Sequence, residues 1–205
     1  SRDNRQLIMD KFPKLNRFLT GYDLRHVFND EMTEFDLTRI LTGSEGTLAF
    51  ITEARLDITP LPKVRQLVNV KYDSFDSALR NAPVMVEARA LSVETVDSKV
   101  LNLAREDIVW HSVSELITDV PDKEMLGLNI VEFAGDDEVL INSQVSALCE
   151  RLDGLIARQE AGVIGWQLCT ELAGVERIYA MRKKAVGLLG SAERSGTGTT
   201  GHMPR

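Results

Sequence analysis

The sequence is poor in cysteine, has no long apolar run and carries no excess of basic residues. Its two cysteines, Cys149 and Cys169, lie in apolar segments and form no CxxC motif, which favours buried thiols in a reduced, cytoplasmic protein. No apolar run approaches the roughly 20 residues that span a bilayer, so no transmembrane segment is expected. The net charge of -7 disfavours a nucleic-acid partner, because it repels phosphate.

Several common catalytic patterns are missing too. The glycines form no GxGxxG fingerprint, and none is followed by the Lys-Ser/Thr pair of a P-loop. His26 and His111 have no metal-ligand partner at a useful spacing, so no metal site is predicted and both are interpreted as surface or capping residues. No Ser/His/Asp set can be assembled, and the tryptophans and phenylalanines are too scattered for a nucleotide-stacking platform.

The beginning of the chain lacks the basic and then apolar order of a signal peptide. It also lacks an initiator methionine, so we expect the chain to be an internal piece of a longer protein. Hydrophobic residues make up 43% of it and charged residues 27%, which is typical of a folded globular protein.

A boundary is predicted at residues 60–62, Pro-Leu-Pro. Before it, apolar and polar positions alternate from residue 47 to residue 59, and a period of two over this length predicts a long strand or a pair of strands. The two prolines end this ladder, since neither can donate a hydrogen bond to it.

Beyond residue 62 the pattern becomes regular. Strands are predicted at residues 64–72, 91–96, 126–133 and 163–170. Helices are predicted after a cap at Asp73 or Ser74, in one or two short pieces within residues 98–120, after the turn at 135–137, and at about 174–189. Pro83 is expected to kink or split the first of these helices. Two strand–helix–strand halves predict a ferredoxin-like α+β fold, which many unrelated activities share.

The last segment, residues 191–205, is small, polar and rich in glycine. Such a composition cannot build a core, so we predict a disordered tail or a segment added during cloning. His202 in this tail is interpreted as a loop residue or a cloning remnant.

Residues 43–47, Gly-Ser-Glu-Gly-Thr, are the first candidate for chemistry. Two glycines three positions apart allow a close backbone approach or a positive φ, and consecutive N–H groups in such a turn can bind an anion. Ser44 and Thr47 add hydroxyl groups. The alternative is an ordinary glycine turn that leads into a strand.

Arg182 is the second candidate. On the last predicted helix it projects to the middle of an apolar face made by Val175, Ile178, Ala185, Val186 and Leu189. A desolvated, unpaired arginine is unfavourable, so it either pairs with a buried carboxylate or meets an anionic ligand such as a substrate carboxylate.

Two ordinary structural alternatives for Arg182 remain open. The side chain can reach water along its own length, or it can pair with Glu94 or Glu171.

Three ordered motifs, followed by fainter ones, resemble a known family. Residues 21–24 (GYDL), 40–48 (ILTGSEGTL) and 51–54 (ITEA) are similar to the signature of FAD-linked oxidases of the vanillyl-alcohol oxidase or p-cresol methylhydroxylase type. That family includes D-lactate, glycolate and D-2-hydroxyglutarate dehydrogenases. The likeness extends through residues 60–62, 92–94 and 181–185, and it looks strongest to large bacterial members with an iron–sulfur domain downstream.

The resemblance implies an FAD-dependent oxidoreductase that oxidises a small D-2-hydroxy acid. Residues 1–62 would be the C-terminal portion of the FAD-binding α+β domain, and residues 63–190 an incomplete ferredoxin-like cap with an antiparallel sheet. Arg182 matches the family arginine that binds the substrate carboxylate. The residues implied to lie along FAD are Tyr22, Gly43, Ser44, Glu45, Gly46, Thr47, Leu48, Ile51 and Thr52.

The resemblance also implies that electrons pass to a quinone, a cytochrome or an iron–sulfur centre rather than to a nicotinamide. The cysteine usage predicts a cytoplasmic protein, with peripheral attachment to the inner face of the membrane as the alternative. The rival hypothesis keeps the fold without the flavin, as a non-catalytic module for small-ligand binding or dimerisation.

The chain departs from the family pattern in several places, among them the region after Arg182, where related dehydrogenases have metal-binding histidines and this chain has its polar tail. Nothing before Gly21 supplies the glycine-rich loop that holds the FAD pyrophosphate in family members. Val186 stands where a threonine is common, and Ala49 where glycine is usual. We therefore expect the isolated chain to bind FAD weakly or not at all.

Overall fold

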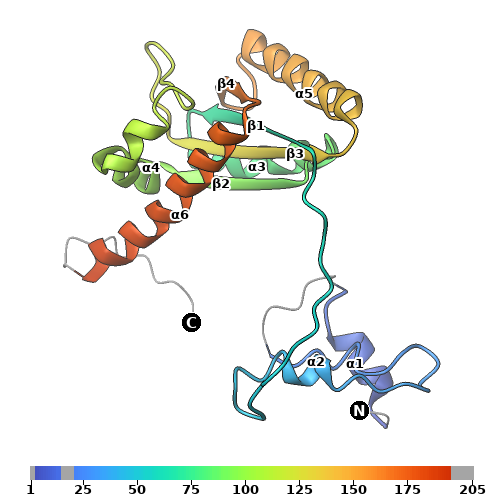
Figure 1. The fold of residues 1–205 in the computed structure, drawn as a ribbon. Helices are drawn as coiled ribbons and strands as arrows, with labels where there is room; N and C mark the ends of the chain where they lie inside the picture. Colours follow the sequence, from blue (N-terminus) through green and yellow to red (C-terminus); the bar gives the residue numbers. More distant parts are fainter. Residues whose placement is uncertain (1–2, 15–20, 195–205) are drawn as a thin grey trace. The chain divides into compact units, whose positions relative to one another are not determined.

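The computed structural model describes residues 3–14 and 21–194 (Figure 1). The chain divides into two compact units, Ser1–Thr59 and Pro60–Arg205, and each is described here by itself. The division falls at the first of the two prolines predicted to mark a boundary. No helix within the described residues is long and apolar enough to cross a membrane.

The N-terminal unit holds two short helices, α1 (Arg5–Lys11) and α2 (Thr38–Leu41). Its only described β contact is an isolated antiparallel bridge between Phe28 and Phe35. Arg5 Nη1 donates to the carbonyl of Arg25 at 2.8 Å, which ties α1 to the following loop. The unit therefore depends on loop contacts more than on regular secondary structure.

The strand predicted for residues 47–59 is wrong. This segment has no ladder partner, and its apolar side chains face solvent: Phe50 is fully exposed and Ile58 is 91% exposed. A strand exists only where its N–H and C=O groups meet those of a neighbouring strand. Within residues 3–14 and 21–59 the structure offers no such neighbour, so the alternating pattern remains an unpaired extended run.

The C-terminal unit contains one four-stranded sheet and its covering helices. Its elements are, in order, β1 (Val64–Tyr72), α3 (Phe75–Glu87), β2 (Ser92–Asp97), α4 (Ser98–Glu106), η1 (Ile108–Ser112), β3 (Gly127–Gly135), α5 (Glu138–Arg158), β4 (Val163–Cys169) and α6 (Leu172–Arg194). The strands lie in the order β2-β3-β1-β4, and every neighbouring pair is antiparallel. The predicted ferredoxin-like α+β fold with an antiparallel sheet is confirmed.

Both faces of this sheet are covered, because its central strands place buried apolar side chains on each face. Val68 and Val70 of β1 point into the core beneath α3 and α5, whereas Leu67 points into the core beneath α4 and α6. Figure 1 shows α6 crossing the second face. A ferredoxin-like sheet needs only two helices on one face, so α4, η1 and α6 form an added layer.

Side-chain caps begin two of the helices where the sequence predicts them. Ser74 Oγ accepts from the N–H of Ser77 at the start of α3, so Ser74 rather than Asp73 is the N-cap. Asp137 caps α5 through the N–H of Leu140. Such caps satisfy amide groups that the first helical turn leaves without a partner.

Pro83 was predicted to kink or split helix α3, and the helix is not split: it continues through this residue. Since Pro83 has no N–H, the carbonyl of Leu79 loses its usual helical partner, and the exposed position of both residues lets water replace it. We expect Pro83→Ala to raise the free energy of unfolding by about 1–2 kcal/mol, because it restores this hydrogen bond. The gain is reduced because the unfolded chain without proline has a higher conformational entropy. Urea denaturation of the 205-residue chain measures the change.

Pro121→Ala is the matched control for this prediction. Pro121 lies in a turn, where proline suits the backbone, so its replacement should bring no gain in stability. A stability for Pro83→Ala equal to or below that of the unchanged chain would contradict the prediction.

Helix α6 also differs from the prediction at its end. It continues to Arg194, four residues into the segment expected to be a disordered tail. Residues 195–205, which make up the rest of that predicted tail, lie outside the described residues.

Candidate functional site

The loop of residues 43–47 begins with a close contact between two stretches of main chain. A Cβ atom on Gly43 would lie 2.1 Å from the carbonyl oxygen of Gly21 and 3.1 Å from the Cα of Tyr22. Gly43 is therefore required by the neighbouring backbone, and its close approach is to this chain rather than to a ligand. The contact places Tyr22 beside the loop, as the two sequence motifs implied.

The second glycine serves a different purpose. Gly46 has φ +78°, the left-handed region that favours glycine, and a Cβ there would meet nothing within 4 Å. Glu45 before it also has a positive φ, +49°. In the part of the chain that the structure describes, no carbonyl accepts a hydrogen bond from the amides of these two residues. The loop thus presents two exposed main-chain donors beside open space.

The two hydroxyl groups of the loop turn inward. Ser44 is buried, and its Oγ donates to the carbonyl of Leu41 at 2.8 Å. Thr47 Oγ1 donates to the carbonyl of Ser44 at 2.6 Å. These hydroxyls stabilise the turn, so the donors available to a ligand are main-chain N–H groups.

The remaining predicted cofactor residues lie at or near the surface of the same unit. Tyr22 is 40% exposed, Leu48 55% and Ile51 67%, and Thr52 is exposed beside them. Leu48, Ile51 and Thr52 belong to the unpaired extended run. The structure brings Tyr22 and residues 43–47 together, and it describes Arg182 in the other unit.

Arg182 does not lie in the middle of the buried face of α6. The buried stripe consists of Val175, Ile178, Met181 and Ala185, whereas Val186, predicted as part of it, is 52% exposed. Arg182 lies at the margin of this stripe, with 45% of its side chain exposed. The predicted conflict between an arginine and an apolar core is therefore absent.

The partner of Arg182 is Glu94, one of the two carboxylates considered from the sequence. Arg182 Nε forms an ion pair with Glu94 Oε2, and the Glu94 side chain is 25% exposed. Glu94 lies on β2, beneath α6. This pair leaves a half-exposed guanidinium at the edge of the sheet, and guanidinium is well suited to bind a carboxylate with two parallel hydrogen bonds.

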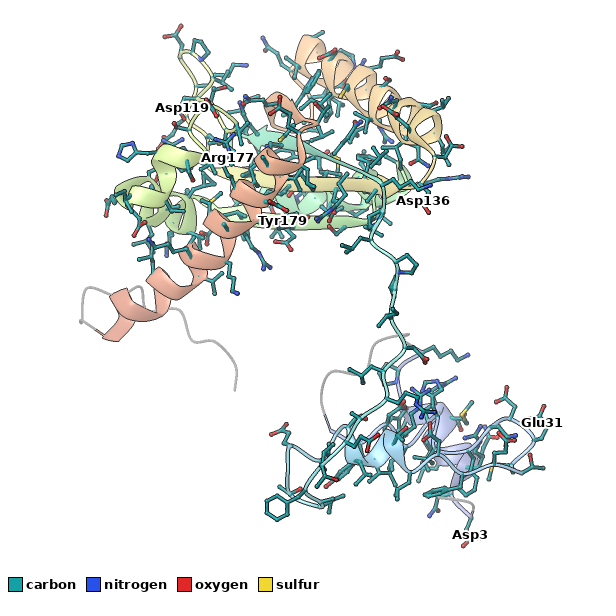
Figure 2. All side chains as sticks on the ribbon, viewed as in Figure 1. Asp3, Glu31, Asp119, Asp136, Arg177 and Tyr179 are labelled. Carbon is teal, nitrogen blue, oxygen red and sulfur yellow. The ribbon has the colours of Figure 1, made fainter. Side chains whose placement is uncertain are left out.

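A second polar cluster lies close by, centred on Glu132 of β3. Arg65 Nη2 pairs with Glu132 Oε1 at 2.7 Å, and Tyr179 Oη donates to Glu132 Oε2 at 2.6 Å. Ser92 Oγ donates to the same carboxylate at 3.1 Å. Figure 2 labels Tyr179 on α6 where the helix crosses the sheet, one turn before Arg182. Four side chains from four elements are thus joined beneath α6.

The electrostatics of this cluster follow from partial burial. Desolvation raises the pKa of Tyr179 to about 12, and its hydrogen bond to Glu132 acts in the same direction. Burial also acts to raise the pKa of Glu132, but the hydrogen bonds from Tyr179 and Arg65 and the charge of Arg65 outweigh it. The pKa of Glu132 therefore lies below its ordinary value, and the carboxylate is charged at neutral pH.

Sequence reasoning missed the Glu132 cluster. One signal was present: Glu132 is the single charged residue in the apolar run of β3, and a carboxylate there needs a partner. Its partners Arg65, Tyr179 and Ser92 lie 67, 47 and 40 residues away along the chain, so no local pattern could name them.

No metal centre is found among the described residues, where no group of three or more His, Cys, Asp or Glu side chains is placed to hold an ion. His26 contacts Asp23 instead, with Nδ1 2.8 Å from Oδ1. Asp23 is buried and also accepts from the N–H of His26. The contact organises the loop that follows Tyr22.

Comparison with known families decides the classification. Residues 61–200 match the family described as FAD linked oxidases, C-terminal domain. This match covers more than half of the chain. The chain belongs to the FAD-linked oxidase family. The resemblance drawn from the GYDL and GSEGTL motifs is confirmed at this level.

Relatives of this FAD-linked oxidase chain include D-2-hydroxyglutarate dehydrogenases. It is 88% identical to the one from Escherichia coli K12 and 77% identical to the one from Pantoea ananatis, over 94% of this chain in each case. A D-2-hydroxyglutarate dehydrogenase from Pseudomonas putida is 47% identical over 92% of the chain and 18% of its own length. The chain spans about a fifth of the length of the first two relatives, 19% of each.

Proposed function

We propose that the chain is part of an FAD-dependent dehydrogenase that oxidises a small D-2-hydroxy acid. The observation that carries this proposal is 88% identity to a D-2-hydroxyglutarate dehydrogenase along 94% of the chain. D-2-hydroxyglutarate is therefore the first substrate to test, ahead of D-lactate and glycolate. The Arg182 guanidinium supports a carboxylate substrate by its chemistry and its exposure.

The N-terminal unit would supply part of the FAD site. The amides of Glu45 and Gly46 suit the polar ribityl and pyrophosphate portion of FAD, since they have no main-chain acceptor among the described residues and the space beside Gly46 is open. Tyr22, Gly43, Ser44 and Thr47 hold this loop in shape. When bound, FAD supplies the two-electron acceptor for the oxidation of the hydroxyl-bearing carbon.

The exposed residues after the loop would contribute to the same site. Leu48, Ile51 and Thr52 lie in an unpaired run whose apolar side chains face solvent. A run of this kind favours further contacts in the full-length protein, because isolated apolar exposure on this scale is unusual. We assign these residues to the cofactor side of the site.

Arg182 would orient the substrate. A guanidinium that pairs with the carboxylate of a 2-hydroxy acid holds the adjacent carbon in one orientation, and such positioning lowers the barrier for the transfer step. This role needs an exposed edge of the guanidinium, which a side chain at the margin of α6 provides.

The electron acceptor belongs to the same proposal. We propose a non-nicotinamide acceptor, namely a quinone, a cytochrome or an iron–sulfur centre carried by the full-length protein. A cytoplasmic location, with or without peripheral attachment to the membrane, goes with these acceptors.

Absorbance spectra of two purified samples test the proposal. The full-length protein should be yellow, with the visible absorbance of bound flavin and about 1 FAD per chain. The 205-residue chain should be colourless, because it contains only part of the proposed FAD-binding site. Addition of D-2-hydroxyglutarate, more than D-lactate or glycolate, should bleach the flavin absorbance of the full-length protein. A colourless full-length protein would instead favour the non-catalytic binding module.

A further inference from the structure

We propose that Glu94 is a positioning residue that holds Arg182 ready for the substrate carboxylate. The inference rests on the proposed function, in which Arg182 binds the hydroxy acid. It assigns to Glu94 a purpose beyond charge balance, namely to fix which edge of the guanidinium faces the substrate.

The backbone holds Glu94 firmly in place. Glu94 lies inside β2, where its Cα is paired with that of Ile130 across the antiparallel ladder. Strand alternation puts Ser92, Glu94 and Val96 on one face, and both Ser92 and Val96 have partners there, Glu132 and the apolar core beneath α6. The Glu94 carboxylate therefore starts from a fixed point under the helix.

One turn earlier, helix α6 is anchored on the two central strands, β3 and β1. Tyr179 Oη donates to Glu132 Oε2 at 2.6 Å, and the Arg65 guanidinium lies 5.6 Å from the centre of the Tyr179 ring. Met181 and Ala185, on either side of Arg182, are buried in the core. The Cα of Arg182 is thereby fixed as well, so the contact of Glu94 with Nε restrains the side chain at its backbone and at the base of the guanidinium.

The atoms used in this pair decide its consequence. Glu94 Oε2 binds Nε of Arg182, the nitrogen nearest the helix. Bidentate pairing with a second carboxylate can then use the opposite edge, formed by Nη1 and Nη2. Glu94 thus leaves the edge formed by Nη1 and Nη2 free for the substrate carboxylate. The Arg182 side chain is 45% exposed, so this edge can be reached.

A competing role for Glu94 would be a placeholder that the substrate displaces. That role requires the Glu94 carboxylate to move away from Arg182 when the substrate binds. Glu94 has little room for such a movement, because its side chain is only 25% exposed and lies beneath a packed helix. If Glu94 already orders the Arg182 side chain, less conformational entropy is lost when the substrate binds. Loss of one such restraint weakens affinity by roughly 10-fold.

The test measures kcat and KM separately in the full-length enzyme with D-2-hydroxyglutarate. Glu94→Ala should raise KM about 10-fold and leave kcat and the FAD absorbance unchanged. Glu94→Gln should raise KM less, because it keeps the length of the side chain and a polar oxygen beside Nε, although it removes the charge. Glu87→Ala is the matched control: it removes a carboxylate that pairs with Arg151 on the exposed surface, and it should change neither constant.

A double variant separates this inference from the proposed function. If Glu94 acts through Arg182, then adding Glu94→Ala to Arg182→Ala should cause no further rise in KM. A fall in KM for Glu94→Ala would show a placeholder and overturn the inference. An unchanged KM for both Glu94 variants, with a large effect of Arg182→Ala, would overturn it while the proposed function stands. An unchanged KM for Arg182→Ala would overturn the substrate role of Arg182 itself.

Discussion

Replacing Arg182 by alanine in the full-length enzyme is expected to lower kcat/KM for D-2-hydroxyglutarate about 100-fold, since a charge-assisted bidentate contact contributes roughly 2–3 kcal/mol. FAD content should not change, because the proposed FAD loop belongs to the other unit of the chain. Stability should fall as well, because the substitution leaves the Glu94 carboxylate, whose side chain is 25% exposed, without its ion-pair partner. Steady-state kinetics and the flavin absorbance of the same samples measure these quantities.

Two further variants sharpen this prediction. Arg182→Lys should recover only part of the loss, because an ammonium keeps the charge and lacks the planar fork that pairs with carboxylate. Arg151→Ala is the control, since Arg151 is an exposed arginine on α5 that pairs with Glu87. An equal loss of FAD and of substrate affinity in Arg182→Ala would contradict the substrate role and assign Arg182 to the fold.

Replacing Glu132 by alanine is expected to destabilise the chain by about 3 kcal/mol, the second large effect. The substitution removes the acceptor of both Tyr179 and Ser92 and leaves Arg65, whose side chain is 29% exposed, without its partner. Breaking a buried ion pair from one side leaves an uncompensated charge, which costs more than an exposed pair contributes. Urea denaturation of the 205-residue chain measures the loss.

The pH dependence gives this prediction a second readout. The folded state lowers the pKa of Glu132, so its contribution to stability is present above the ordinary carboxylate pKa and is lost as pH falls through the lowered value. The acid loss of stability should therefore be smaller in Glu132→Ala than in the unchanged chain. Tyr179→Phe, which keeps the Arg65 pair, is the control and should cost only about 1 kcal/mol at neutral pH.

Tyr179→Phe checks the other half of the cluster as well. Because folding raises the pKa of Tyr179 to about 12, the contribution of Tyr179 to the free energy of unfolding is present at neutral pH and is lost as pH rises from the ordinary value of 10.0.

A steeper loss of stability in acid for Glu132→Ala than for the unchanged chain would contradict the role of Glu132 described above.

Local pattern was sufficient for most of the C-terminal unit. The alternation of β1 and the spacing of Ile141, Val145, Leu148 and Leu152 on α5 describe surfaces that must be buried, and the structure buries them. The caps at Ser74 and Asp137 are equally local, because each side chain serves an amide three residues away. The fold class followed from the order of these elements.

Local pattern failed where a partner from elsewhere was needed. Residues 47–59 have the alternation of a strand, yet a strand is a property of two segments, and the described N-terminal unit has only one. The position of Arg182 was misjudged for a related reason. A helical face computed from spacing did not reveal that Met181, rather than Val186, completes the buried stripe over this sheet.

The sequence by itself determined the family, through the GYDL and GSEGTL motifs, and the order of the strands and helices in the C-terminal unit. Motifs and hydrophobic periodicity are both local properties, which neighbouring residues in the sequence determine. The tertiary structure alone decided that Arg182 pairs with Glu94 rather than Glu171, and that Glu132 gathers Arg65, Ser92 and Tyr179. The physical reason is distance along the chain. A buried charge requires some partner, but which partner it meets depends on which strand the sheet order places beneath the helix.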